Sequence, residues 1–107
     1  MENAQIIDGI RQVAARVLPK GSSLYLYGSR ARGDAREDSD WDLLLLLDKP
    51  KVESEDFDKY TYTIMVNGFD QWQLFSVQTY TKDQWFNGPH AMYYYNVENE
   101  KKLLYES

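Results

Sequence analysis

The sequence predicts an α/β (α+β) fold: a small mixed β-sheet of three or more strands flanked by helices. Two observations predict it. Strand-like and helix-like segments alternate along the chain, and one strand is a run of five leucines at residues 43–47. A strand that is apolar on both faces is buried on both faces, so this run belongs at the centre of the sheet. With 107 residues, 43% of them hydrophobic, the chain is expected to form one domain over residues 1–107.

The first half of the chain divides at clear stop signals. Apolar residues recur every three or four positions over residues 3–17, which predicts a helix that ends before the following proline. A strand is predicted over residues 23–27 and ends at Gly28. Residues 29–32 are expected to form a helical turn, and the leucine strand is predicted over residues 40–48.

The second half is less regular. A helix is predicted over residues 53–66, with the following Asn-Gly pair as its stop. Its inward side chains are expected to be those of Phe57, Tyr60, Ile64 and Met65. Imperfect alternation over residues 71–81 indicates a third strand. A helical turn is predicted over residues 82–85, and a closing helix over residues 90–105.

Composition excludes several classes of function. The chain has no cysteine, so disulfides, thiolate metal sites and cysteine nucleophiles are absent. Its N-terminus lacks the basic start and apolar run of a secretory signal, and no apolar run approaches the length of a membrane span, so we expect a cytoplasmic protein with no membrane partner. The net charge of −5 argues against a long nucleic acid as ligand.

Two acids at the start of the leucine strand are the first candidate site. Asp40 and Asp42 are two positions apart, so strand pleating is expected to place both carboxylates on one face. Like charges held so close favour a bound cation, and Mg²⁺ (or Mn²⁺) takes carboxylate oxygens together with substrate phosphates. An acidic strand edge facing water is the alternative for an Asp-x-Asp taken alone.

The turn before these acids is the second candidate. Glycine at the end of a strand lets the backbone approach a phosphate closely, and the hydroxyl of Ser29 can donate to a phosphate oxygen. Arg30 and Arg32 bring positive charge to the same segment, and arginine makes bidentate contacts with phosphate. Taken alone, Gly28 and Ser29 also fit a simple turn with a helix cap, and the arginines fit a solvated loop.

Together the two candidates form a recognisable pattern. The stretch Gly28-Ser29-Arg30-Ala31-Arg32-Gly33, followed by Ser39-Asp40-Trp41-Asp42 and the leucine strand, resembles the signature of the DNA polymerase beta-like nucleotidyltransferase superfamily, above all its minimal, single-domain branch. The resemblance implies that Gly28 and Ser29 hold a nucleoside triphosphate while Asp40 and Asp42 bind one or two Mg²⁺ ions. It also implies that an acceptor hydroxyl attacks the α-phosphate and pyrophosphate leaves, with Arg30 and Arg32 steadying phosphates.

The sequence departs from this family at the third strand. Active members usually supply a third carboxylate there, as metal ligand and as base, whereas residues 71–81 contain no acid. Asp70, just before the strand, could fill the role if the strand begins earlier. Otherwise Gln73, Ser76 or Gln78 occupies the place, and none of them can act as an anionic base. Trp41, between the two acids, is expected to point to the opposite face and to pack in the core.

Three hypotheses follow. The first, motivated by the intact Gly-Ser and Asp-x-Asp elements, is a nucleotidyltransferase that attaches AMP from ATP to a protein hydroxyl. The resemblance further implies pairing, as toxin and antitoxin, with a small helical protein of the HEPN class. The second is a catalytically degenerate nucleotide-binding or partner-binding module. The third is a transferase for a small molecule or an RNA end, with the acceptor pocket built across a homodimer. Tyr93, Tyr94 and Tyr95 cannot all face one core, because three successive residues point in three directions around a helix. At least one is expected to be exposed to solvent, and contact with a partner or with a second copy of the chain is the alternative.

Overall fold

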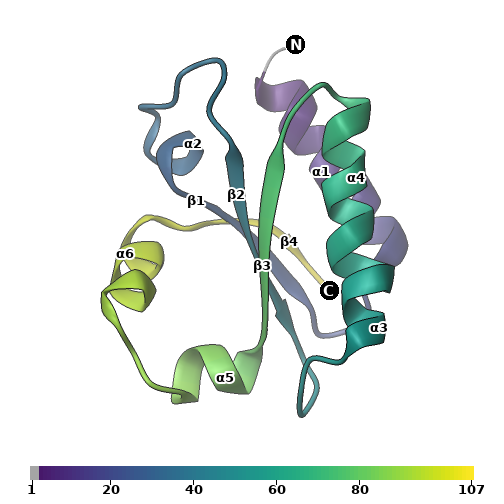
Figure 1. Cartoon of the computed structure of the whole chain (residues 1–107), viewed down its shortest axis with the longest axis vertical. Helices are drawn as coiled ribbons and strands as arrows, with labels where there is room; N and C mark the ends of the chain where they lie inside the picture. Colours follow the sequence, from purple (N-terminus) through teal and green to yellow (C-terminus); the bar gives the residue numbers. More distant parts are fainter. Residues whose placement is uncertain (1–2) are drawn as a thin grey trace.

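The computed structural model describes residues 3–107 (Figure 1). In chain order the elements are α1 (Asn3–Val17), β1 (Ser23–Tyr27), α2 (Ser29–Arg32), β2 (Trp41–Leu47), α3 (Ser54–Asp56), the π-helical segment η1 (Phe57–Thr61), α4 (Tyr62–Asp70), β3 (Phe75–Thr81), α5 (Lys82–Asn87), α6 (Met92–Glu100) and β4 (Lys102–Glu106). The predicted helix over residues 3–17, the strand over residues 23–27 and the turn over residues 29–32 are confirmed.

The four strands form one mixed sheet in the order β3-β2-β1-β4. β1 pairs antiparallel with β2 and with β4, whereas β2 and β3 run parallel. The leucine strand β2 therefore lies inside the sheet, as its two apolar faces predict. A mixed sheet with helices against it is the predicted fold class, and the structure confirms it.

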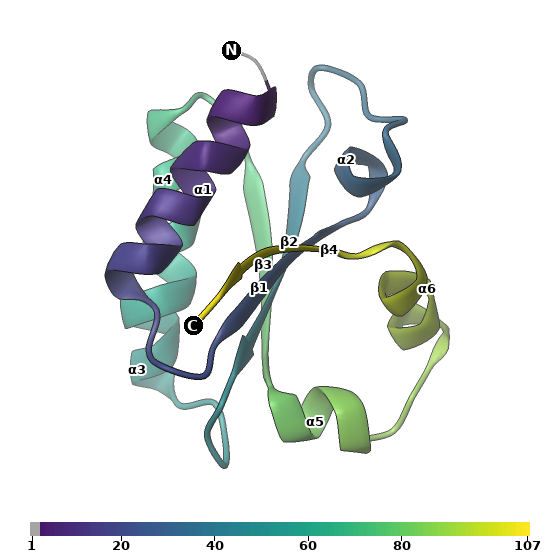
Figure 2. The ribbon, with the colours of Figure 1, turned by 180° about the vertical axis from the view of Figure 1, so that it is seen from behind.

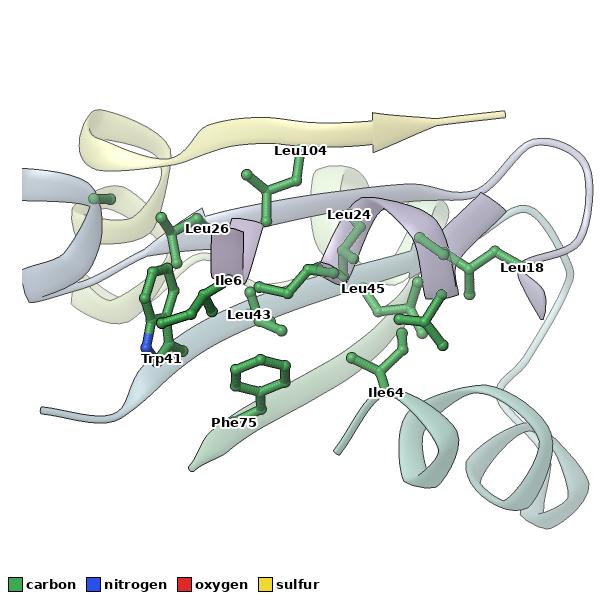
Figure 3. Packing of buried hydrophobic residues seen from close by; sticks show 14 of the residues in the cluster. Ile6, Leu18, Leu24, Leu26, Trp41, Leu43, Leu45, Ile64, Phe75 and Leu104 are labelled. Carbon is green, nitrogen blue, oxygen red and sulfur yellow. The ribbon is translucent and has the colours of Figure 1, made fainter. Parts of the chain in front are cut away.

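Two apolar layers cover the two faces of this sheet. On one face, α1 and α4 lie side by side (Figures 1 and 2) and bury Leu43, Leu45 and Leu47 of β2. Figure 3 shows this larger layer, in which Trp41 meets Phe75 near the start of β2. On the other face, α5 and α6 cover Leu44 and Leu46. Successive leucines of β2 therefore pack alternately into the two apolar layers, as side chains of a strand point to opposite faces of a sheet.

The helical segment before β3 is longer than predicted. The helix over residues 53–66 was expected to stop at Gly68, but α3, η1 and α4 continue through that glycine to Asp70. Gly68 is buried, and a Cβ there would crowd the Phe75 ring. The glycine therefore allows close packing against β3 and does not end the helix. The exposed Phe57 (48%) also contradicts its predicted inward position, whereas Ile64 is buried as predicted.

The third strand begins later than predicted. Amide groups of Gln71, Trp72 and Gln73 donate to carbonyls at the end of α4, so these residues form a tight turn instead of strand. Trp72 has a positive φ of 58° and a side chain that is 92% exposed. β3 therefore starts at Phe75 and runs to Thr81.

The closing segment corrects the prediction of one helix over residues 90–105. α6 ends at Glu100, and Lys102–Glu106 form the edge strand β4 beside β1. The buried Leu104 anchors β4 to the larger layer, where a continued helix could not reach β1. Within residues 3–107, none of the helices combines the length and the apolar character that crossing a membrane requires.

Candidate active site

The bend after β1 is the centre of the candidate site. Gly28 has φ 74° and ψ −159°, a conformation that is nearly exclusive to glycine. A Cβ built on Gly28 would overlap Oδ2 of Asp42, so the backbone of the bend lies directly against that carboxylate. The structure thus brings the Gly-Ser bend and the second acid of the predicted motif into contact.

Asp42 occupies a partly buried place on the sheet. It faces Tyr27 in the β1–β2 register, on the side covered by α5 and α6. Burial raises the pKa of Asp42 above its usual range, the charges of Asp40 and Glu100 raise it further, and Arg32 acts in the opposite direction. Partial burial and two nearby acids thus disfavour the charged form of Asp42, and a bound cation would offset both effects.

Asp40 lies just outside the strand, because β2 begins at Trp41 instead of the predicted residue 40. Its side chain is exposed. Strand pleating therefore fixes the direction of Asp42 only, while the charge of Asp40 contributes to the raised pKa of Asp42. Trp41 points to the other face, as predicted: it is 1% exposed, and its indole N–H donates to Oε1 of Gln73 at 3.0 Å.

Ser29 opens the single turn α2, in which the Gly28 carbonyl accepts from the amides of Ala31 and Arg32, each at 3.0 Å. The Ser29 side chain is partly exposed beside the bend. Arg30 turns away to the loop before β2, where its guanidinium donates to the carbonyls of Ser39 and Glu37 and lies over the Trp41 ring. In this arrangement Arg30 fixes the loop that carries Asp40.

Glu100 is a site residue that the sequence analysis missed. Its Oε1 accepts from the Gly28 amide at 2.9 Å, and its Oε2 accepts from the Arg32 guanidinium at 2.9 Å. Arg32 also bonds Asp34. The last residue of α6 thus joins the bend to Arg32 and adds a negative charge near Asp42. Residues 102–106 read Lys-Leu-Leu-Tyr-Glu and do not alternate apolar with polar positions, so no local pattern marks the end of α6 at Glu100.

The third strand supplies no carboxylate on the Asp42 side. In the parallel register Ser76 pairs with Asp42 and Gln78 with Leu44, so a hydroxyl and an amide face the site. Asp70 is the last residue of α4, exposed, and it lines a pocket with Arg16 and Tyr62 on the helical layer that covers the other face. Asp70 is not among the charged groups that shift the pKa of Asp42, so its position gives no support to a role as third carboxylate.

Asp40 and Asp42 are the side chains of the site that could hold a divalent cation. Among residues 3–107 no three acidic, histidine or cysteine side chains converge on one point. Asp40 and Asp42 offer hard oxygen donors, and Mg²⁺ commonly uses one or two carboxylates while substrate phosphates and water complete its shell. The residues present therefore fit an ion that arrives with a polyphosphate better than a permanent structural metal.

Solved structures share this fold. A crystal structure of a toxin-antitoxin with AMP-PNP has a TM-score of 0.68 at 15% identity, and the match covers 94% of this chain and 73% of that one. A mutant of the toxin-antitoxin MntA-HpeT gives a TM-score of 0.64 at 13% identity, covering 100% and 75% of the two chains. A candidate nucleotidyltransferase from Sulfolobus solfataricus gives 0.58 at 16% identity, covering 96% and 82%.

Sequence comparison identifies the family. No curated protein sequence matches the chain. The model of the nucleotidyltransferase domain family, in contrast, matches residues 7–104, which include the bend, both acids of the motif and Glu100. The chain belongs to the nucleotidyltransferase domain family.

Proposed function

We propose that this chain transfers a nucleoside monophosphate, AMP from magnesium-bound ATP, to a hydroxyl group of an acceptor. The observation that carries the proposal is the contact between the Gly28 bend and the Asp42 carboxylate. A phosphate chain beside that bend would share a cation with the acid pair. Positioning and charge neutralisation are most of what such a transfer asks of a protein.

Five residues of the site have a direct role in this proposal. Asp40 and Asp42 would hold Mg²⁺ (or Mn²⁺), which when bound neutralises the phosphates and polarises the α-phosphate. Gly28 and Ser29 would cradle the triphosphate, and Arg32 would balance its charge. The acceptor oxygen forms a bond to the α-phosphorus and its hydroxyl proton passes to water. The bond from that phosphorus to the oxygen bridging to the β-phosphate breaks, and pyrophosphate leaves.

A partner protein is the acceptor that we favour. Large apolar side chains are exposed at the end of α4 and the turn after it, where Phe69 is 59% and Trp72 is 92% exposed. Exposed large aromatic side chains are enriched at protein interfaces. Two of the similar structures are toxin-antitoxin assemblies, which supports a protein partner in such a pair. The family resemblance adds that this partner would be a helical HEPN-class protein and that this chain would be the antitoxin. A homodimer is the alternative use of the same surface.

The proposal is tested by transfer of label from ATP that carries it in the α-phosphate. The purified chain is incubated with Mg²⁺ and a HEPN-class protein, and the acceptor is located by mass spectrometry. We expect covalent attachment of AMP, reduced by about a thousandfold or more in Asp42→Asn, because the acid would no longer neutralise the triphosphate with its cation. Asp38→Asn is the matched control, since Asp38 is an exposed acid of the same loop, and it should retain full transfer.

A binding module without catalysis is the second candidate, and the absence of an acid among residues 71–81 favours it. Calorimetry separates the two. Binding of MgATP that is lost in Asp42→Asn, without any labelled product, would establish the module. Transfer that is equal in the wild-type chain and in Asp42→Asn would contradict both candidates.

A further inference from the structure

An aromatic pocket lies on the face of the sheet that carries Asp42. It has a volume of about 220 Å³, and aromatic rings of Tyr80, Trp85, Tyr93 and Tyr94 form much of its wall. Complete sites for small molecules usually measure about 300–1,000 Å³. This pocket therefore fits one part of a ligand, and its aromatic wall suits an uncharged planar part.

The pocket is a fixed feature of the fold. Trp85 is 5% exposed and packs against Tyr94 with ring centroids 5.1 Å apart and against Tyr80 at 5.3 Å. Its indole N–H donates to Oε2 of Glu98 at 2.8 Å. α5, which carries Trp85, begins with a capping box between Thr81 and Gln84. The wall is thus held from β3, α5 and α6 at once.

Tyr93 connects the pocket to the acid pair. Its ring stands edge-on to Trp85, with centroids 5.9 Å apart, while its hydroxyl lies 2.9 Å from the hydroxyl of Tyr27. Tyr27 is the direct cross-strand neighbour of Asp42. Burial raises the pKa of Tyr93, and the Asp42 charge contributes to that rise. One tyrosine side chain therefore runs from the pocket wall to the edge of the proposed catalytic centre.

We infer that this aromatic pocket binds the base of the nucleotide whose triphosphate lies between the Gly28 bend and the acid pair. Every nucleobase has a flat π-face, and stacking on aromatic side chains stabilises it. The anionic end of the nucleotide stays with Gly28, Ser29 and Arg32, because the pocket wall carries no cationic side chain. The inference rests on the proposed function and adds to it the residues that hold the base.

The test compares two ligands that share a triphosphate and differ in the base. Calorimetry measures binding of MgATP and of magnesium tripolyphosphate to the wild-type chain, Tyr93→Ala, Tyr93→Phe and Tyr95→Ala. We expect Tyr93→Ala to weaken MgATP by about tenfold or more, the scale of one lost stacking contact, and to leave tripolyphosphate unchanged. Tyr93→Phe keeps the ring and should retain most of the affinity for MgATP.

Tyr95→Ala is the matched control. Tyr95 lies on the same helix, is 53% exposed and is not part of the pocket wall, so both affinities should match the wild type. Equal weakening of both ligands by Tyr93→Ala would overturn the inference, because Tyr93 would then act on the phosphate site through Tyr27. An unchanged affinity of Tyr93→Ala for MgATP, with or without slower transfer, would also overturn the inference. The pocket would then be a candidate site for the acceptor instead.

Fluorescence gives a second readout that needs no change in the pocket. Trp41 is buried on the opposite face, and Trp72→Phe removes the exposed indole, so Trp85 becomes the reporter that a ligand on this face can reach. In Trp72→Phe, MgATP should quench emission and magnesium tripolyphosphate should not. If calorimetry shows that MgATP binds but neither MgATP nor magnesium tripolyphosphate quenches the emission, the base binds outside this pocket. A wild-type chain that binds neither ligand would contradict the proposed function itself.

Discussion

At the scale of single residues, two glycines with positive φ allow a controlled test of the bend. Gly28 (φ 74°) lies against Asp42, whereas Gly33 (φ 87°) has open space where a Cβ would be. Gly28→Ala should lower the free energy of unfolding by about 2–3 kcal/mol, since it adds overlap to backbone strain. Gly33→Ala should cost about 1 kcal/mol from strain alone. Urea unfolding measures both.

The same pair separates stability from ligand binding. Gly28→Ala should abolish MgATP binding at a temperature where the variant is still folded, because the methyl group displaces Asp42 from the bend. Gly33→Ala should bind as the wild type does. Normal binding by a folded Gly28→Ala would show that the contact between the bend and the acid is incidental.

The residue pattern predicted that the Gly28 bend and Asp42 lie together, but it did not predict that Glu100 joins them. Gly28, Ser29, Asp40 and Asp42 form a local signature, and local spacing plus strand pleating is enough to bring a bend and an acid together. Glu100 belongs to the site through contacts with Gly28 and Arg32, which lie far from it in the sequence. Such contacts depend on where β4 docks, and the sequence analysis had assigned that segment to a helix.

At the scale of elements, the start of the α3–α4 helical segment depends on one buried acid. Asp56 is 3% exposed, accepts from the Glu53 amide at 2.7 Å and bonds the Lys49 ammonium at 2.8 Å. Burial alone would raise the pKa of Asp56, but the hydrogen bonds from Lys49 and from the Glu53 amide outweigh it, and the net shift is downward. Asp56 therefore stabilises the fold in its ionised form.

The sign of the pH dependence follows. An aspartate whose pKa is lowered on folding contributes stability above its unfolded value of about 3.9 and loses that contribution as the pH falls through the folded value. Asp56→Asn should cost about 1–2 kcal/mol at neutral pH, and the difference from the wild type should shrink below about pH 4. Urea unfolding from pH 7 to pH 3 checks this. The exposed Asp58, changed to Asn, should show no such convergence.

The predicted ends of helices and strands were wrong at the places where tertiary contacts override local sequence signals. An Asn-Gly pair is typical of a helix stop, yet Gly68 lies inside the helix. Because glycine has no Cβ, the Phe75 ring can pack closely against the backbone at this position. Residues 102–105 were assigned to a helix, but β1 offers an open edge, and pairing there buries Leu104. The leucine strand was placed correctly, because five successive buried apolar residues admit few positions outside the middle of a sheet.

At the scale of the whole molecule, ligand binding and folding are linked. A ligand that binds only the folded chain adds about 2.7 kcal/mol of stability at a concentration of 100 Kd. For a domain of this size, that corresponds to a rise in Tm on the order of 10 °C. Because Asp40 and Asp42 repel one another and are proposed to need a cation, the rise should require Mg²⁺ as well as ATP.

Differential scanning fluorimetry tests this linkage in a few samples. MgATP should raise Tm on the order of 10 °C. ATP with EDTA, and Mg²⁺ alone, should each raise Tm by only a small fraction of that, because two carboxylates form an incomplete metal site without phosphates. Asp42→Asn should remove the joint effect and leave the unliganded Tm unchanged or higher, because it relieves the repulsion from Asp40 and Glu100. An equal rise with ATP in EDTA would show that the nucleotide binds without any cation at the acid pair, and the proposed arrangement of triphosphate and metal would be wrong.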